Sequence, residues 1–226
     1  HVARFQKSDD IVFYNGASEG ATEIAKEGAG KKIAFDASES PVTLEEIKLI
    51  GQHNLSNIAG AYKVAQYFGI PKDTCLTVLK EFRGLPHRLQ TLGTKHGIEW
   101  VDDAISTTPD STIAALDALG DRVTTIILGG QDRGVPFEAL GKRMKSSSVR
   151  TVILFPGSGP RIREAIGNAQ ADVCFVESAT MEDAVATAKK KTAEGTICLL
   201  STASPSYGMF TNFEEKGEKF KTCIEA

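Results

Sequence analysis

Residues 84–112, GLPHRLQTLGTKHGIEWVDDAISTTPDST, contain a Gly-Leu-Pro-His-Arg turn, a hairpin and a polar loop that leads into a helix. The hairpin carries apolar residues at Ile98, Trp100 and Val101. The helix start is well marked, because Thr108 is a favourable N-cap and Pro109 suits the first helical position. This stretch therefore predicts a strand that is joined to a helix by a polar loop.

The polar loop holds two carboxylates and a Ser/Thr cluster, namely Asp102, Asp103, Ser106 and Thr107. A helix over 110–119 directs its N-terminal N–H groups back at them, which favours an anionic ligand. The same residues also suit a capped surface helix after a hairpin, which is the commoner role of such residues. On this loop alone we favour the capped helix.

Beyond the loop, short apolar runs alternate with helical patterns. We expect strands over 123–128, 149–155, 173–176 and 196–200, and helices over 136–144, 161–169, 181–193 and 212–221. Such alternation predicts right-handed crossovers and a Rossmann-like, mostly parallel α/β sheet. The fold class is therefore α/β.

The part of the chain before Gly84 has a different pattern. We expect strands over 11–14 and 32–35, a short helix over 21–27, an extended segment over 42–50 and helices over 51–70 and 72–82. These elements resemble the end of a sheet whose other strands lie upstream, so we expect a piece of a longer chain. The predicted domains are 1–84 and 85–226, with Gly84 at the boundary.

Composition argues against several classes of protein. A net charge of −3 and a pI near 5.9 give no reason to expect binding to nucleic acid or to an anionic membrane. No apolar run approaches the roughly 20 residues of a membrane span, and no signal-peptide pattern opens the chain. The four cysteines have no metal-like or redox spacing, and we expect Cys174 and Cys198 to be small core residues. A cytoplasmic, reduced monomer is the expectation.

Ligands of an open parallel sheet collect at the carboxyl ends of its strands. Here those ends are 102–103, 129–133, 156–159 and 201–207, which are rich in Gly, Ser, Thr and charge. Neither GGQDRG nor PGSG matches a P-loop or a dinucleotide fingerprint. The four histidines form no evident metal cluster, and no Ser-His-Asp motif is present, so we predict no metal site and assign no catalytic residue.

Five motifs in one order narrow the choice: GQHNLSN at 51–57, GLPHR at 84–88, VDDAISTTPDSTIAAL at 101–116, ILGGQDRG at 127–134 and LLSTASPSYGMFTNFEEKGEKF at 199–220. Together they resemble the Mur ligases, and the last motif resembles the glutamate-adding branch. The resemblance implies the end of a central ATPase domain, over 1–84, followed by the whole Rossmann-like amino-acid domain, over 85–226. The P-loop, the Mg²⁺ ligands and a carbamylated lysine of the family would lie elsewhere, and these residues alone are expected to be inactive.

The implied reaction uses ATP and Mg²⁺ to activate UDP-MurNAc-L-Ala as an acyl phosphate, which the amine of glutamate, D-glutamate by preference, attacks in peptidoglycan precursor synthesis. By resemblance, the nucleotide-binding residues are His53, Asn54, Asn57, His87, Arg88 and Asp103. By resemblance, the glutamate-binding residues are Thr107, Arg133, Ser206, Tyr207 and Phe213.

Two departures leave the stereochemistry of the glutamate open. Ile105 stands where the D-glutamate enzymes have lysine, and Arg133 stands where they often have lysine, which replaces a point charge by a planar fork. An L-glutamate-adding variant and a non-catalytic Rossmann-like binding domain remain alternatives. A relative of the folylpolyglutamate or cyanophycin enzymes is a third, disfavoured by Ser206 and Phe213. Each residue also has a structural explanation: Asn54 as a helix cap, Arg88 in an ion pair, Phe213 in the core.

Overall fold

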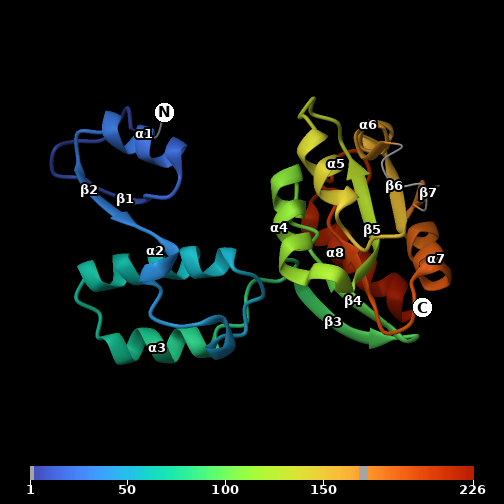
Figure 1. Cartoon of the computed structure of the whole chain (residues 1–226), viewed down its shortest axis with the longest axis horizontal. Helices are drawn as coiled ribbons and strands as arrows, with labels where there is room; N and C mark the ends of the chain where they lie inside the picture. Colours follow the sequence, from blue (N-terminus) through green and yellow to red (C-terminus); the bar gives the residue numbers. More distant parts are fainter. Residues whose placement is uncertain (1–2, 168–172) are drawn as a thin grey trace. The chain divides into compact units, whose positions relative to one another are not determined.

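The computed structural model describes residues 3–167 and 173–226 and divides the chain into two compact units, His1–Arg83 and Gly84–Ala226. Figure 1 shows both units, coloured along the chain. The break falls beside Gly84, where the sequence predicts the boundary. The functional identities given to the two parts stay predictions.

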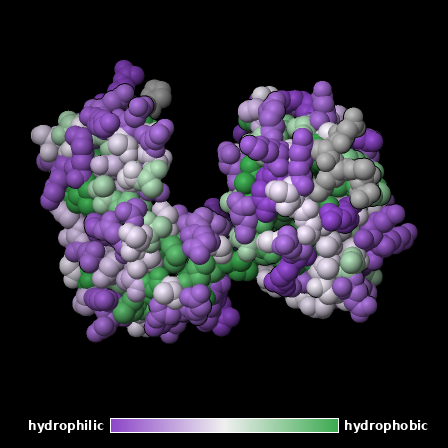
Figure 2. All heavy atoms as spheres, in the orientation of Figure 1, coloured by the Kyte–Doolittle hydropathy of each residue, from purple (hydrophilic) through white to green (hydrophobic). Residues whose placement is uncertain are grey.

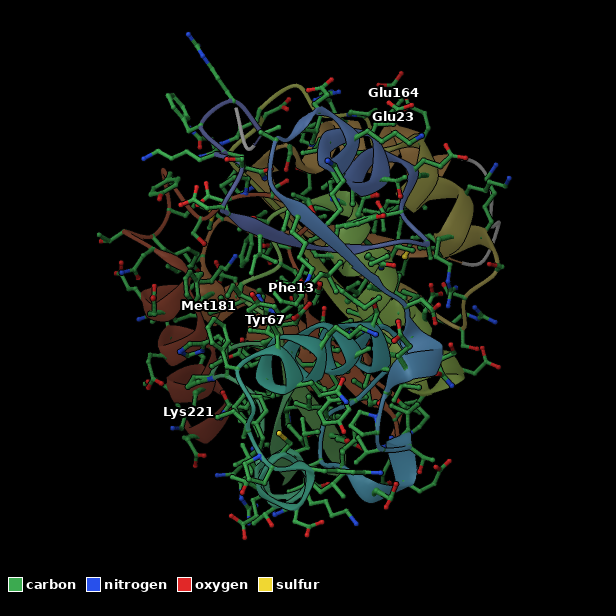
Figure 3. All side chains as sticks on the ribbon, turned by 90° about the vertical axis from the view of Figure 1, so that its left-hand side faces the viewer. Phe13, Glu23, Tyr67, Glu164, Met181 and Lys221 are labelled. Carbon is green, nitrogen blue, oxygen red and sulfur yellow. The ribbon has the colours of Figure 1, made fainter. Side chains whose placement is uncertain are left out.

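The first unit is a small β-α-β arrangement followed by two helices. Its elements are β1 (Ile11–Asn15), α1 (Glu19–Glu27), β2 (Lys31–Phe35), the 3₁₀ turns η1 (Ala37–Glu39) and η2 (Leu44–Glu46), α2 (His53–Tyr67) and α3 (Lys72–Glu81). β1 and β2 pair in parallel through the α1 crossover. Phe13 of β1 meets Tyr67 of α2 edge to face, with ring centroids 5.8 Å apart (Figure 3).

The prediction of an extended segment over 42–50 is wrong. η2 forms there instead, and the Glu46 carboxylate accepts a hydrogen bond from Thr43 N at 3.0 Å in a capping box. This local side-chain hydrogen bond stabilises the turn, and the weak alternation of apolar residues is not enough to favour an extended segment instead.

Apolar burial is uneven between the units. In the first unit, Tyr67, Phe68, Ile70, Val78 and Phe82 are exposed hydrophobic residues, and hydrophobic patches are visible on its surface (Figure 2). Most of the fully buried apolar side chains belong to the second unit. The main hydrophobic core therefore lies in the second unit.

The second unit is built on a six-stranded sheet. Its strands are β3 (Gln90–Lys95), β4 (Ile98–Asp102), β5 (Val123–Gly130), β6 (Thr151–Gly157), β7 (Cys174–Glu177) and β8 (Ile197–Leu200). Their order is β3-β4-β8-β5-β6-β7, and only the β3–β4 hairpin is antiparallel. The predicted mostly parallel α/β fold is confirmed.

Helices cover both faces of this sheet (Figure 1). α4 (Pro109–Leu119), α5 (Glu138–Lys145) and α6 (Gly159–Ile166) pack against one another in sequence, with the short η3 turn (Gly120–Arg122) after α4, whereas α7 (Met181–Lys191) packs against α8 (Phe213–Glu225). Ile127, Ile153 and Leu200 form a core cluster with residues of α7 and α8. Because side chains alternate along a strand, their sequence neighbours point to the opposite face.

The position of β8 creates a crevice in the sheet. β8 lies between β4 and β5, and the chain leaves β4 and β5 toward α4 and α5 but leaves β8 toward α8 on the other face. Adjacent connections that diverge in this way form a topological switch point, where open α/β sheets bind ligands. The polar loops after β4, β5 and β8 all meet there.

Three smaller expectations need correction. The helix expected over 161–169 begins earlier, at Gly159, and residues 168–169 lie outside the described part of the chain. The helix expected over 212–221 extends to Glu225, because Ile224 is still buried against the core. Cys198 is buried as expected, but Cys174 is exposed because it begins the edge strand β7. No described helix is both long and apolar enough to cross a membrane.

Candidate functional site

Asp103 is a buried carboxylate at the carboxyl end of β4. Its Oδ2 accepts hydrogen bonds from Ser201 Oγ, at 2.8 Å, and from Ser106 Oγ. Its Oδ1 accepts one from the backbone N–H of Leu89 at 3.2 Å. Burial, with Asp102 beside it, raises the pKa of Asp103 to about 6 in spite of these bonds. Asp103 thus ties the turn before β3, its own loop and the loop after β8 to one group.

A second buried pair holds the same turn. His87 Nδ1 lies 2.7 Å from Asp102 Oδ2, and Asp102 Oδ1 accepts a hydrogen bond from Ala104 N at 2.9 Å. His87 and Leu89 have φ values of 61° and 45°, a region that residues with a side chain rarely occupy. The Asp102 and Asp103 carboxylates therefore fix a strained turn, and backbone strain of this kind often accompanies function.

Arg88 lies between these two strained residues and is exposed. Within residues 3–167 and 173–226 its guanidinium has no hydrogen-bond partner, so the ion-pair explanation for Arg88 finds no support. An exposed guanidinium on a rigid turn is well suited to bind an anionic oxygen.

Lys216 has no role in the predictions above, but the structure places it in the same network. Its side chain on α8 is almost fully buried, and Nζ donates to Thr202 Oγ1 at 2.6 Å. Burial lowers the pKa of Lys216 to about 8, while the charges of Asp102 and Asp103 oppose that shift. The sequence feature that could have pointed to Lys216 is the Lys-Gly pair, which begins three residues after Phe213 in the terminal motif.

Hydrogen bonds join the three loops that carry four of the five predicted glutamate-binding residues, namely Thr107, Arg133, Ser206 and Tyr207. Thr202 O accepts from Gly129 N at 2.9 Å, and Pro205 O accepts from Gln131 N at 2.9 Å. Thr202 Oγ1 lies 3.2 Å from Ser106 O. The loops 104–108, 129–133 and 201–207 therefore form one connected rim at the crevice.

The predicted glutamate-binding side chains differ in what they contact on this rim. The Ser206 hydroxyl is buried and has no hydrogen-bond partner among the residues that the structure describes. Arg133 is exposed, with its guanidinium carbon 5.8 Å from the ring centroid of Tyr207. Phe213 is half-buried and meets His87 edge to face at 6.1 Å, and Thr107 is also half-buried. A buried hydroxyl without a partner is uncommon in native proteins, which points to a polar ligand at Ser206.

The remaining predicted residues lie together at the start of α2 in the first unit. His53 is exposed on the first turn, and Asn57 Nδ2 donates to Asn54 Oδ1 at 3.3 Å. The interpretation of Asn54 as a helix cap is wrong, because Gln52 is the N-cap and Asn54 Nδ2 donates back to Ile50 O at 2.9 Å. This helix start presents a cluster of amide groups.

A cavity elsewhere in the second unit contains none of these residues. It has a volume of about 380 Å³ and lies at the carboxyl ends of β6 and β7, lined by residues 154–157, 159–160 and 177–179. Across the described ranges, no three His, Cys, Asp or Glu side chains group in a way that would hold a metal ion. The candidate site is therefore the connected rim, not this cavity.

We expect the stability of the second unit to depend on the ionisation of Asp103. The folded-state pKa, about 6, lies above the ordinary value of 3.8, so proton binding by Asp103 stabilises the fold at low pH. That contribution, on the order of 2–3 kcal/mol, should be lost as pH rises from about 4 to about 6. The measurement is urea unfolding of the chain and of Asp103→Asn at several pH values. A difference between the two proteins that does not change with pH contradicts the prediction.

Three kinds of comparison with known proteins agree with one another. The family model described as "Mur ligase, glutamate ligase domain" matches residues 87–204. The UDP-N-acetylmuramoylalanine--D-glutamate ligase of Hahella chejuensis is 34% identical over 90% of this chain and 45% of its own length. That of Symbiobacterium thermophilum is 34% identical over 83% and 41%. The UDP-N-acetylmuramoyl-L-alanine--L-glutamate ligase of Salinispora tropica is 36% identical over 79% and 40%. The chain thus spans less than half the length of these curated relatives.

Solved structures share the fold. MurF of Acinetobacter baumannii matches all of this chain and 54% of its own, with a TM-score of 0.73 and 14% identity. MurF of Thermotoga maritima, in complex with ADP, matches 99% of this chain and 56% of its own, with a TM-score of 0.68 and 18% identity. At such low identity the match supports the fold alone.

Proposed function

From the premise that this chain belongs to the Mur ligase family, through its glutamate ligase domain, we propose that it serves an ATP-dependent ligase that adds glutamate to UDP-MurNAc-L-Ala. D-glutamate is the favoured amino acid. The observation that carries the proposal is the buried, unpartnered hydroxyl of Ser206 on a rim of three connected loops. A substrate oxygen supplies the partner that the hydroxyl lacks.

The glutamate site is proposed on that rim. Ser206 and Thr107 donate to one carboxylate, and Arg133 binds the other through its guanidinium fork. Tyr207 and Phe213 flank these residues and limit access of water. Fixing both carboxylates orients the amine toward the activated carboxyl group, which is a positioning contribution to catalysis.

The nucleotide contacts are proposed on two groups of residues. Arg88 binds phosphate oxygens, with His87 and Asp103 holding its turn in place. His53, Asn54 and Asn57 offer imidazole and amide groups to the adenosine portion. ATP supplies the phosphoryl group that activates the alanine carboxylate. Among the described residues no three His, Cys, Asp or Glu side chains group as metal ligands, and the sequence has no P-loop, so we derive no step through Mg²⁺ from this chain.

The test is phosphate release with ATP, UDP-MurNAc-L-Ala and either glutamate enantiomer. The complete ligase should turn over faster with D-glutamate, and residues 1–226 alone should give no turnover, because their sequence has no P-loop to cradle the ATP phosphates. Turnover by residues 1–226 alone would refute this account of the chain. Absence of release with every amino acid would favour the non-catalytic binding domain instead.

A second candidate is the L-glutamate-adding variant. It is favoured by the Salinispora tropica relative and by Ile105, an apolar residue at a position where the resemblance implies a lysine. Faster turnover with L-glutamate would keep the ligase proposal and reverse its stereochemistry.

A further inference from the structure

Lys216 is a buried cation that the proposed contacts with nucleotide and glutamate leave unused. It is 1% exposed and is among the largest fully buried side chains of the chain. Burying an ammonium group is costly unless it is paired and hydrogen-bonded, and a buried pair seldom adds net stability. The position of Lys216 therefore calls for an explanation other than stability.

The partner of Lys216 is a hydroxyl at a junction between two loops. Thr202 Oγ1 lies 2.6 Å from Lys216 Nζ, 2.9 Å from Ser204 O and 3.2 Å from Ser106 O. An ammonium group only donates, so the Thr202 hydroxyl accepts from it and directs its own proton to one of the carbonyls. Ser106 precedes Thr107, and Ser204 lies two residues before Ser206. Lys216 thus fixes the direction of the Thr202 hydroxyl, which lies between the loop of Thr107 and the loop of Ser206 and sets the distance between them.

The next residue of α8 lies against the turn that carries Arg88. A Cβ on Gly217 would overlap His87 Nδ1 and lie 2.7 Å from Asp102 Oδ2. The Asp102 and Asp103 carboxylates also supply the negative charge that Lys216 faces. Two adjacent residues of one helix therefore reach both the Arg88 turn and the glutamate rim.

We propose that Lys216 is a positioning residue, which sets the spacing of the Thr107 and Ser206 loops through the Thr202 hydroxyl and so controls the affinity for glutamate. It does so without touching the substrate. This inference rests on the proposed function, because it assigns those loops to glutamate.

The kinetic test compares five variants in the complete ligase. Lys216→Met and Thr202→Val should each raise the KM for glutamate about tenfold, while the KM for ATP changes less than about twofold. The double variant should have a KM for glutamate no higher than that of the more impaired single variant, as expected for two members of one interaction. Lys216→Arg, which keeps the donor, should recover most of the affinity. Lys221→Met is the matched control, since Lys221 is exposed on the same helix (Figure 3). Equal rises in both KM values, or no rescue by arginine, would overturn the proposal.

A second measurement needs no activity. The amides of Gly129 and Gln131 donate to the carbonyls of Thr202 and Pro205, so their hydrogen exchange reports the rim in residues 1–226 themselves. Lys216→Met should speed exchange at these two amides, whereas Lys221→Met should leave it unchanged. Unchanged exchange in Lys216→Met refutes the positioning role. If exchange is faster in Lys216→Met but the complete protein has no ligase activity, the proposed function is refuted and the positioning role of Lys216 in the rim is not.

Discussion

Replacing Gly217 with alanine should destabilise the second unit by about 2–4 kcal/mol, because the added methyl group overlaps the buried His87–Asp102 pair. Gly217 lies inside α8, where alanine is ordinarily favoured over glycine by about 1 kcal/mol. Here the new Cβ meets His87 and Asp102 on a turn that is already strained. The sign of the effect is therefore opposite to the usual one.

Urea unfolding, followed by the fluorescence of Trp100, measures this change. Trp100 is the single tryptophan of the chain and is fully buried in the second unit. Gly20→Ala is the matched control, since Gly20 lies in helix α1 and a Cβ there meets nothing within 4 Å. The control should gain about 0.5–1 kcal/mol in the first unit, followed by circular dichroism. Equal gains in both variants would show that α8 does not press against the His87–Asp102 pair.

Replacing Arg88 with alanine should lower kcat/KM of the complete ligase by about 10²–10³ while the unfolding midpoint stays unchanged. The guanidinium is exposed and bonded to no residue in the described part of the chain, so its removal costs the fold little. What is lost is a cation held by a rigid turn where phosphoryl charge develops. Phosphate release under saturating and limiting ATP separates the effect on kcat from that on KM.

Two further variants define the Arg88 effect. Arg88→Lys keeps the charge but not the planar fork, and should recover only part of the loss. Arg83→Ala removes an exposed arginine five residues earlier and should leave the kinetics unchanged. A fall in the unfolding midpoint of Arg88→Ala, with kcat/KM preserved, would assign Arg88 a structural role instead.

Local patterns were sufficient to predict most of the secondary structure. The Thr108-Pro109 start of α4 and the apolar runs of β4, β5, β6 and β8 follow from capping chemistry and short-range periodicity. The turn at 42–50 was missed because a side-chain bond from Glu46 outweighed a weak alternation. The edge position of Cys174 was missed because exposure of a strand depends on its neighbours in the sheet.

The candidate site was predicted only in part. Ser206 and Thr107 were found from their positions in recognisable motifs, and the structure places them on loops joined by hydrogen bonds. Lys216 was missed, because a lysine within Glu-Glu-Lys-Gly-Glu-Lys has the composition of a solvated helix face. Lys216 is buried because α8 packs against the sheet, and the residues next to Lys216 in the sequence do not reveal this packing.

By itself, the sequence determined the fold class, the family and the loops in which the polar residues of the site lie, because each secondary-structure signal and each motif depends on residues near one another in the chain. Only the tertiary structure decided which polar groups meet. Ser201 reaches the Asp103 carboxylate across 98 positions of sequence. That contact exists because β8 inserts between β4 and β5, which places two chain-distant loops at one crevice, where burial raises the pKa of Asp103 and lowers that of Lys216.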